Sequence, residues 1–316
     1  MAQELLSVHK ICKNFGPTAA LKDVDFTLRR GEIHGLVGEN GPGKSTLTSI
    51  IAGHRRPDSG TMMKDGQPYA PRDAVDAQQK GVAMLLQEMG TAPDLTVAEN
   101  ICLGRERDFR RGGLVSKKEL NRAAQAALDK LGIRHIRPEL PVFTLGMEDR
   151  KLVELAKAMV SDPDVLIVDE TTTALSHDGR EILFSVIEKM RREDKGVIFI
   201  SHDLDELIHI CTIITVLRDG DIIGTLTKEQ FAPDTIKTMM VGRELKGHYY
   251  RADYGEEAGE QVVLRARHLT GAEIVEDVSF ELRAGEILGF GGLSSGGIHE
   301  LGRLLFGLDK VIYGSV

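Results

Sequence analysis

The fold is decided by one short stretch, Gly38-Glu39-Asn40-Gly41-Pro42-Gly43-Lys44-Ser45. It matches the pattern G-x-x-x-x-G-K-[ST] of phosphate-binding loops. The apolar run at residues 32–37 before it predicts a buried strand, and residues 46–52 after it predict the start of a helix. A strand, a loop and a helix in this order are the setting that the motif requires, so the sequence predicts a phosphate site here.

The chemistry of the stretch explains why it would bind phosphate. Glycines let backbone N–H groups turn inward as a concave anion site, and the N-terminus of the following helix adds partial positive charge. Lys44 can reach the β- and γ-phosphates of a nucleotide, and the Ser45 hydroxyl can ligate Mg²⁺. The alternative is a plain glycine-rich turn, which does not account for a lysine and a hydroxyl at these positions.

Composition bounds the class of protein. The length of 316 residues favours about two domains. The net charge of -8 disfavours a general nucleic-acid binder. No apolar run approaches the roughly 18–20 residues of a transmembrane helix, and the first residues do not resemble a signal peptide. The scattered Cys12, Cys102 and Cys211 favour reduced, buried thiols over disulfides or a zinc site.

Three further apolar segments predict buried parallel strands, and each ends in a polar side chain. The carboxyl ends of parallel strands are where open α/β sheets bind ligands. We therefore expect these side chains to share one edge of a sheet with the phosphate loop. They are Gln87 after residues 82–86, Asp169 and Glu170 after residues 165–168, and His202 after residues 196–201.

Each of these side chains has a chemical role and a plainer alternative. Asp169 can hold a Mg²⁺ ion shared with Ser45, and Glu170 can orient and deprotonate an attacking water. His202 can donate to a γ-phosphate oxygen, and Gln87 is placed to meet a ligand. The alternatives are a solvated strand end for the acids, an ordinary histidine, and an ordinary strand-end glutamine.

Phe15 is the remaining candidate in the first part of the chain. Residues 5–24 predict short extended segments around a turn that contains Phe15 and the following Gly-Pro pair. An aromatic ring here can stack on an adenine base, or it can be a core aromatic. The spacing alone does not decide between the two.

The chain contains an internal repeat. Residues 277–287 copy residues 23–33 at an offset of 277 − 23 = 254, and the loop glycines recur at the same offset. The residues at the positions of Lys44 and Ser45 are Ile298 and His299. We expect a first domain at residues 1–242, a linker at 243–261, and a second, degenerate copy at 262–316. Because the chain stops at Val316, that copy is expected to be incomplete.

With these residues in hand, the chain resembles ATP-binding subunits of ABC transporters, and among them the tandem type of bacterial ribose, galactose and xylose importers. The resemblance covers essentially the whole chain. The residues that carry it are 38–46, Gln87-Glu88, 95–100, 153–158, Asp169-Glu170, Ser201-His202, 216–220, 240–244 and 285–289.

The resemblance implies an α/β P-loop ATPase core with an antiparallel β subdomain and a helical subdomain at about residues 88–160. It implies that Phe15 stacks on adenine, that Glu170, His202 and Gln87 are catalytic, and that Mg²⁺ lies among Ser45, Gln87 and Asp169. It also implies that ATP is bound by Phe15, Gly38, Glu39, Asn40, Gly41, Pro42, Gly43, Lys44, Ser45 and Thr46.

The resemblance further implies the partners and the place of work. Hydrolysis of Mg-ATP would energise import of a sugar or sugar-like solute through transmembrane permease subunits, at the cytoplasmic face of the membrane. A solute-binding protein would act indirectly. The second ATP-binding domain would be supplied in cis or by a homodimer, and no nucleic acid is expected.

Three stretches depart from the family pattern: the signature, the Asp-Glu-Pro-Thr of the family, which is Asp169-Glu170-Thr171-Thr172 here, and the phosphate loop with its Pro42. The signature, roughly Leu-Ser-x-Gly-Gln in the family, is Leu145-Gly146-Met147-Glu148-Asp149 here, so a serine and a glycine are lost and two acids are gained. In such ATPases each nucleotide lies between the P-loop of one domain and the signature of the other. We therefore expect one competent and one vestigial site, and weak hydrolysis by this chain alone.

Three other functions fit part of the sequence. A soluble tandem ABC ATPase in translation or DNA maintenance would usually carry basic tails or long charged linkers, which are absent from the sequence. A P-loop small-molecule kinase does not explain Gln87 and His202. A non-catalytic regulatory ABC subunit is compatible with the altered signature.

Pro42 generates a first prediction, because proline has no N–H and removes one donor from the phosphate loop. Replacing Pro42 with alanine should restore that donor and tighten binding of Mg-ATP, by roughly two- to tenfold for one hydrogen bond. Titration of both chains with a fluorescent ATP analogue measures this difference. Equal affinities would show that the missing N–H does not matter.

Overall fold

The computed structural model describes residues 3–39, 41, 43–88, 90–111, 114–242, 259–292 and 296–316. The chain divides into two compact units, Met1–Glu244 and Leu245–Val316, which are described separately below. Most of the predicted linker at 243–261 lies outside the described residues.

A six-stranded sheet forms the centre of the first unit, in the order β12-β11-β3-β10-β9-β6. Strands β11, β3, β10, β9 and β6 pair in parallel, and β12 pairs antiparallel with β11 at one edge. The predicted strands before the phosphate loop, Gln87, Asp169 and His202 are therefore confirmed as parallel neighbours. The strands are β3 (Ile33–Val37), β6 (Val82–Leu85), β9 (Val165–Asp169), β10 (Gly196–Ile200), β11 (Ile213–Arg218) and β12 (Asp221–Thr227).

Each face of this sheet is covered by its own core. In β10, Val197 and Phe199 pack into the core shared with the helices on one face, and Ile198 and Ile200 pack into the core on the other. This alternation follows from the two-residue period of a strand, and burial on both faces explains why the strand is apolar throughout. The helices beside the sheet are α1 (Gly43–Ile51), α2 (Ala74–Gln79), α6 (His177–Arg192), α7 (Leu204–Ile210) and α8 (Pro233–Val241).

An antiparallel sheet of order β2-β1-β4-β5 covers the second of these cores. The predicted extended segments around the turn at Phe15 are confirmed, but they are strands of 12 residues each and are therefore not short. Register shifts lie between Val8 and Ile11, and Lys10 and Asp23 have positive φ, so the alternation is interrupted while the pairing continues. The strands are β1 (Glu4–Phe15), β2 (Thr18–Arg29), β4 (Ser59–Lys64) and β5 (Gln67–Pro68).

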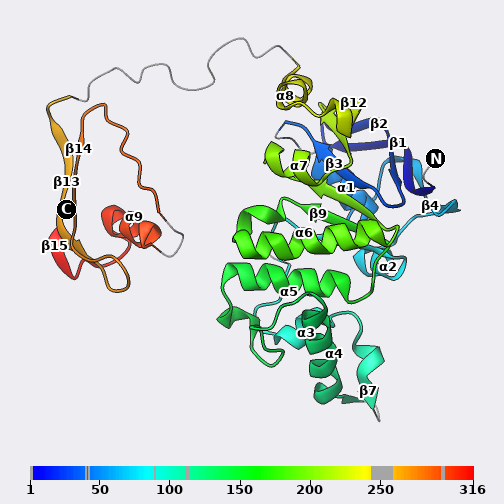
Figure 1. The fold of residues 1–316 in the computed structure, drawn as a ribbon, viewed down its shortest axis with the longest axis horizontal. Helices are drawn as coiled ribbons and strands as arrows, with labels where there is room; N and C mark the ends of the chain where they lie inside the picture. The colour runs from blue at the N-terminus through cyan, green and yellow to red at the C-terminus, as the bar shows by residue number, and fades with distance from the viewer. Residues whose placement is uncertain are drawn as a thin grey trace. The chain divides into compact units, whose positions relative to one another are not determined.

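A helical subdomain is inserted between β6 and β9, as the sequence predicts, and its α5 lies beside α6 (Figure 1). Apolar side chains of its helices join the first core. Its elements are α3 (Val97–Ile101), η1 (Glu106–Phe109), β7 (Arg110–Arg111), β8 (Leu114–Val115), α4 (Lys117–Lys130), η2 (Val142–Thr144) and α5 (Met147–Met159). Two 3₁₀ turns, η3 (Thr171–Ala174) and η4 (Lys228–Gln230), complete the first unit.

The second unit repeats the pairing of the first. Its strand order is β14-β13-β15, all antiparallel, as β2-β1-β4 is in the first unit. A Cβ on Gly314 would lie 2.2 Å from the carbonyl oxygen of His268, just as one on Gly60 would lie 2.4 Å from that of Lys10. The elements are β13 (Val262–Thr270), β14 (Val278–Arg283), α9 (Ile298–Phe306) and β15 (Tyr313–Ser315).

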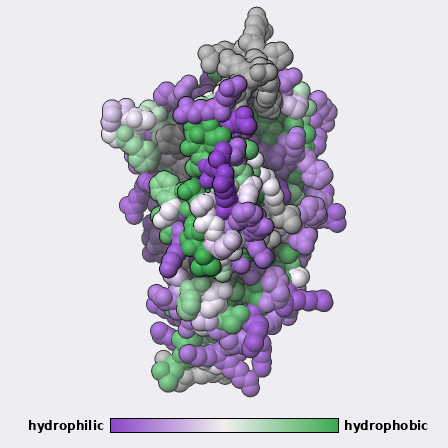
Figure 2. All heavy atoms as spheres, turned by 90° about the vertical axis from the view of Figure 1, so that its left-hand side faces the viewer, coloured by the Kyte–Doolittle hydropathy of each residue, from purple (hydrophilic) through white to green (hydrophobic). Residues whose placement is uncertain are grey.

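Among the described residues, no helix combines the length and the apolar character needed to cross a bilayer. The face drawn in Figure 2 is mostly hydrophilic, with apolar residues gathered in smaller patches.

The packing of the phosphate loop generates a second prediction. A Cβ on Gly38 would lie 1.9 Å from the carbonyl oxygen of Leu217 in β11, whereas a Cβ on Gly41 would meet no described atom within 4 Å. Replacing Gly38 with alanine should lower the free energy of unfolding by about 2–4 kcal/mol, and the Gly41→Ala control should change it by less than about 0.5 kcal/mol. Urea unfolding measures both, and equal losses would contradict the packing argument.

Candidate functional site

The phosphate loop connects β3 to α1 and lies against β11. A Cβ on Gly43 would lie 2.3 Å from Cδ2 of Leu217, and Gly38 is confined by the same residue. Gly38 is therefore required by the close approach of the loop to the backbone of β11, whereas a Cβ on Gly43 would require the Leu217 side chain to move. Helix α1 begins at Gly43, so the loop ends directly at a helix N-terminus, where N–H groups and the helix dipole favour an anion. The predicted site residues Asn40 and Pro42 lie outside the described residues.

Lys44 extends its amine back into the loop. Its Nζ donates to the carbonyl oxygens of Gly38 at 2.9 Å and Glu39 at 2.8 Å, and the side chain is buried. Burial lowers the pKa of the Lys44 amine, while the nearby carboxylates of Glu170 and Asp169 oppose that shift. The loop thus holds the Lys44 ammonium group close to two carboxylates. This is the place where a phosphate group bound at the N-terminus of α1 would lie.

Asp169 fits a divalent cation. Its Oδ1 is buried and has no hydrogen-bond partner among the described residues. The Ser45 side chain forms a hydrogen bond with the same carboxyl group. Burial raises the pKa of Asp169 to about 6, and the adjacent Glu170 adds to the increase. A buried carboxylate with an unsatisfied oxygen beside a serine hydroxyl is a hard oxygen donor set of the kind that Mg²⁺ prefers.

The three predicted catalytic side chains meet at Glu170. Gln87 donates its Nε2 to Glu170 Oε2 at 2.7 Å, and His202 Nε2 lies 2.6 Å from Glu170 Oε1. The Glu170 side chain is largely buried, whereas Gln87 and half of His202 face solvent. The Glu170 carboxylate is therefore contacted on both oxygens at the rim of the site. The backbone of Glu170 lies in the left-handed region, with φ 46°.

Phe15 lies at the end of β1 and outside the apolar cores. It is 37% exposed, and the guanidinium of Arg55 lies 5.1 Å from its ring centroid. The alternative of a core aromatic is therefore wrong. Close by in sequence, Thr18 and Ala20 line a cavity of about 300 Å³ together with Lys44. Stacking of Phe15 on adenine stays a prediction.

The altered signature lies at the start of α5. Glu148 Oε1 accepts the Ser176 hydroxyl at 2.5 Å, and Asp149 Oδ1 lies 2.8 Å from His135 Nε2. The two acids are thus engaged within the domain. Gly146 caps the helix without a side-chain hydrogen bond, and Met147 is 66% exposed.

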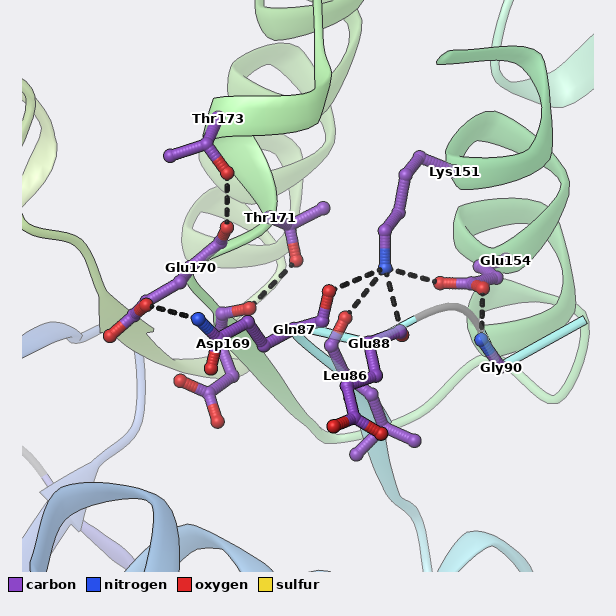
Figure 3. A network of polar contacts seen from close by, with 10 residues as sticks. All are labelled: Leu86, Gln87, Glu88, Gly90, Lys151, Glu154, Asp169, Glu170, Thr171 and Thr173. Carbon is purple, nitrogen blue, oxygen red and sulfur yellow. Dashed lines mark hydrogen bonds and ion pairs between the residues drawn. The ribbon is translucent and has the colours of Figure 1, made fainter. Parts of the chain in front are cut away.

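Sequence reasoning missed several residues that organise the site. Lys151 and Glu154 hold the backbone around Gln87, as Figure 3 shows. Glu206 accepts the hydroxyls of Thr172 and Ser201, both at 2.9 Å, and so ties the segment after Glu170 to the segment before His202. The spacing of Lys151 and Glu154, three residues apart on a helix, is a sequence signal that the two side chains can pair, but it does not indicate their contacts with the segment around Gln87.

Comparisons with known proteins relate this fold to ATP-binding cassettes. Residues 21–173 match the model of a family described as ABC transporter. A crystal structure of a nucleotide-free ATP-binding cassette from an ABC transporter matches with a TM-score of 0.65 and 20% identity, over 75% of this chain and 98% of that one. At this identity the likeness shows the fold alone. The predicted α/β fold with an antiparallel β subdomain and a helical subdomain is confirmed.

Among curated proteins, the chain is similar to ribose import ATP-binding protein RbsA 1 of Rubrobacter xylanophilus, at 43% identity over 312 residues, 99% of this chain and 61% of that protein. It is also similar to a putative ribose/galactose/methyl galactoside import ATP-binding protein of Burkholderia cenocepacia. The identity is 42% over 316 residues, which cover 100% of this chain and 59% of that protein. The chain thus spans about three fifths of the length of these relatives.

Asp169 generates a third prediction. Its folded pKa of about 6 lies above the ordinary value of 3.8, so the folded chain retains a proton that the unfolded chain loses between these pH values. Asp169 therefore destabilises the nucleotide-free chain as pH rises through this window. Asp169→Asn should raise the free energy of unfolding by about 2 kcal/mol at pH 7 and leave it nearly unchanged below pH ~4. Urea unfolding in metal-free buffer measures this, and destabilisation at pH 7 would contradict it.

Proposed function

We propose that this chain is the ATP-binding and ATP-hydrolysing part of a sugar importer, working at the cytoplasmic face of a membrane on permease subunits. The observation that carries the proposal is the meeting of Gln87, Glu170 and His202 beside the phosphate loop. The names of the relatives, which are import ATP-binding proteins, support sugar as the solute class. A solute-binding protein would deliver the sugar to the permease.

The residues of the loop supply the binding step. The N–H groups at the start of α1 donate to the phosphate oxygens of ATP, and the Lys44 amine turns from its two carbonyl partners to the β- and γ-phosphate oxygens. Ser45 and Asp169, with Gln87 at the rim, would hold a Mg²⁺ ion, which supplies charge neutralisation on the phosphates when bound. Phe15 would carry the adenine.

Glu170 supplies the chemical step. With one carboxylate oxygen held by the Gln87 amide, the carboxylate can accept a proton from a water aligned with the γ-phosphorus. His202 lies on the other oxygen and can donate to the γ-phosphate as negative charge develops there. The products are ADP and inorganic phosphate. Loss of the γ-phosphate releases the contacts of Gln87 and His202, which is the change that the permease would sense.

The site in this chain is one half of a nucleotide site. We infer that residues 262–316 belong to a second, degenerate copy of the cassette. The matching strand order and the matching close contacts of Gly60 and Gly314 support this. Ile298 and His299 occupy the positions of Lys44 and Ser45, so the second loop lacks the cation and the hydroxyl.

A regulatory subunit that binds ATP without hydrolysis is the second candidate. The engagement of Glu148 with Ser176 favours it, because this acid stands where the family signature has a glycine and is tied down within the domain. Both candidate functions require that the chain binds ATP, but only the first requires that it hydrolyses ATP.

Two substitutions test the proposed function. Lys44→Ala should weaken Mg-ATP binding about 10- to 100-fold, because the loop loses its cation. Glu170→Gln should leave binding within about twofold and lower the slow hydrolysis at least about 100-fold, because the base is lost. Equilibrium binding and phosphate release measure both.

The exposed Glu181→Gln on α6 is the matched control for charge and should change neither quantity. Hydrolysis that persists in Glu170→Gln would contradict the role of Glu170. Brisk hydrolysis by the isolated chain, dependent on Lys44, would contradict the half-site.

A further inference from the structure

Lys151 and Glu154 form a buried pair of opposite charge on α5. They are only 2% and 5% exposed, and Lys151 Nζ lies 3.0 Å from Glu154 Oε2. Removing two charges from water costs about as much as their attraction returns, and apolar residues of similar size often pack as well or better. The stability of the helix therefore does not explain why this pair is charged.

The backbone beside the pair does explain it. Lys151 Nζ donates to the carbonyl oxygens of Leu86 at 2.7 Å, Gln87 at 3.3 Å and Glu88 at 3.0 Å. These three carbonyls follow the end of β6, where the sheet no longer offers hydrogen-bond partners, and carbonyl groups in such a position need a donor. An ammonium group has three N–H donors and no acceptor, so it suits a turn that directs several carbonyls to one point.

Glu154 holds the far end of the same turn. Its Oε1 accepts the N–H of Gly90, while its Oε2 bonds to Lys151. The cation therefore gathers carbonyls on one side of the segment and the anion takes an N–H on the other. Figure 3 shows both side chains reaching from α5 to this segment.

The side chain of Gln87 leaves the same segment in the direction of Glu170. The side-chain Nε2 of Gln87 donates to Glu170 Oε2 at 2.7 Å, while the backbone carbonyl oxygen of Gln87 accepts from Lys151 Nζ. A continuous series of contacts thus joins α5 to the carboxylate at the rim of the phosphate site (Figure 3). Lys151 touches neither the loop nor the Glu170 carboxylate in these contacts, so any effect on the reaction must pass through Gln87.

We propose that Lys151 and Glu154 are positioning residues that fix the backbone of residues 86–88 and of Gly90 so that Gln87 orients the Glu170 carboxylate. This inference rests on the proposed function and names two residues on which its chemical step depends. The buried charges fix one path of the backbone. An apolar pair would pack against α5 but would leave the three carbonyls free to turn to water.

The test compares four variants of the full chain. Lys151→Met removes the cation, Lys151→Arg keeps a donor group that can serve the carbonyls, and Lys151→Met/Glu154→Leu replaces both charges by an apolar pair. Lys118→Met is the control for loss of one charge, because Lys118 lies on α4, is exposed, and makes no hydrogen bond from its amine within the described residues. The measurements are the melting temperature, hydrogen exchange of residues 86–90, and the kcat and KM of ATP hydrolysis.

We expect exchange of the Gly90 amide to rise and kcat to fall, each about tenfold, in Lys151→Met and in the double variant, with KM within about twofold. Lys151→Arg should recover most of both losses, and the control should match the parent. The double variant is decisive, because its apolar pair should restore the melting temperature without restoring kcat or the slow exchange.

A double variant with parental exchange and parental kcat would overturn the inference, since the pair would then serve only packing. Hydrogen exchange needs no nucleotide, so it decides the positioning role even where hydrolysis is too slow to measure. If the parent chain shows no Lys44-dependent ATP binding, the proposed function is rejected. If hydrogen exchange still rises in Lys151→Met, the role of Lys151 in fixing the backbone around Gln87 is supported all the same.

Discussion

The site depends on the contact between the Glu170 carboxylate and its two neighbours, the Gln87 amide and the His202 imidazole. That contact is possible only because β6, β9 and β10 are parallel neighbours in one register. Leu85 pairs with Val168, which pairs with Phe199, so the three strands end at the same level. Strand β3 pairs with β10 and brings the phosphate loop to the same edge.

The apolar character of these strands has a second consequence. Because both faces of the sheet are buried, the strands have no freedom to slide without exposing one core, and the register is fixed by packing. The phosphate loop in turn lies against Leu217 of β11, so that Gly38 has no room for a side chain. The core, more than the loop itself, thus sets the position of the cation and the hydroxyl.

Much of this arrangement could be predicted from the sequence. Short apolar runs that end in Gln87, Asp169 and His202 indicate parallel strands, and a phosphate loop indicates where their ends meet. The Lys151 contacts could not be predicted, because they join side chain and backbone groups more than sixty positions apart, and carbonyls have no sequence signal. The length of strand β1 could not be predicted, because bulges near Lys10 interrupt its alternation.

The central claim is that this chain carries one competent nucleotide loop and one vestigial loop. Isothermal titration of the full chain with Mg²⁺ and a non-hydrolysable ATP analogue tests it most directly. The account predicts one bound nucleotide per chain, with an affinity that Lys44→Ala lowers about 10- to 100-fold. Two nucleotides per chain, or one whose affinity does not change in Lys44→Ala, would contradict it.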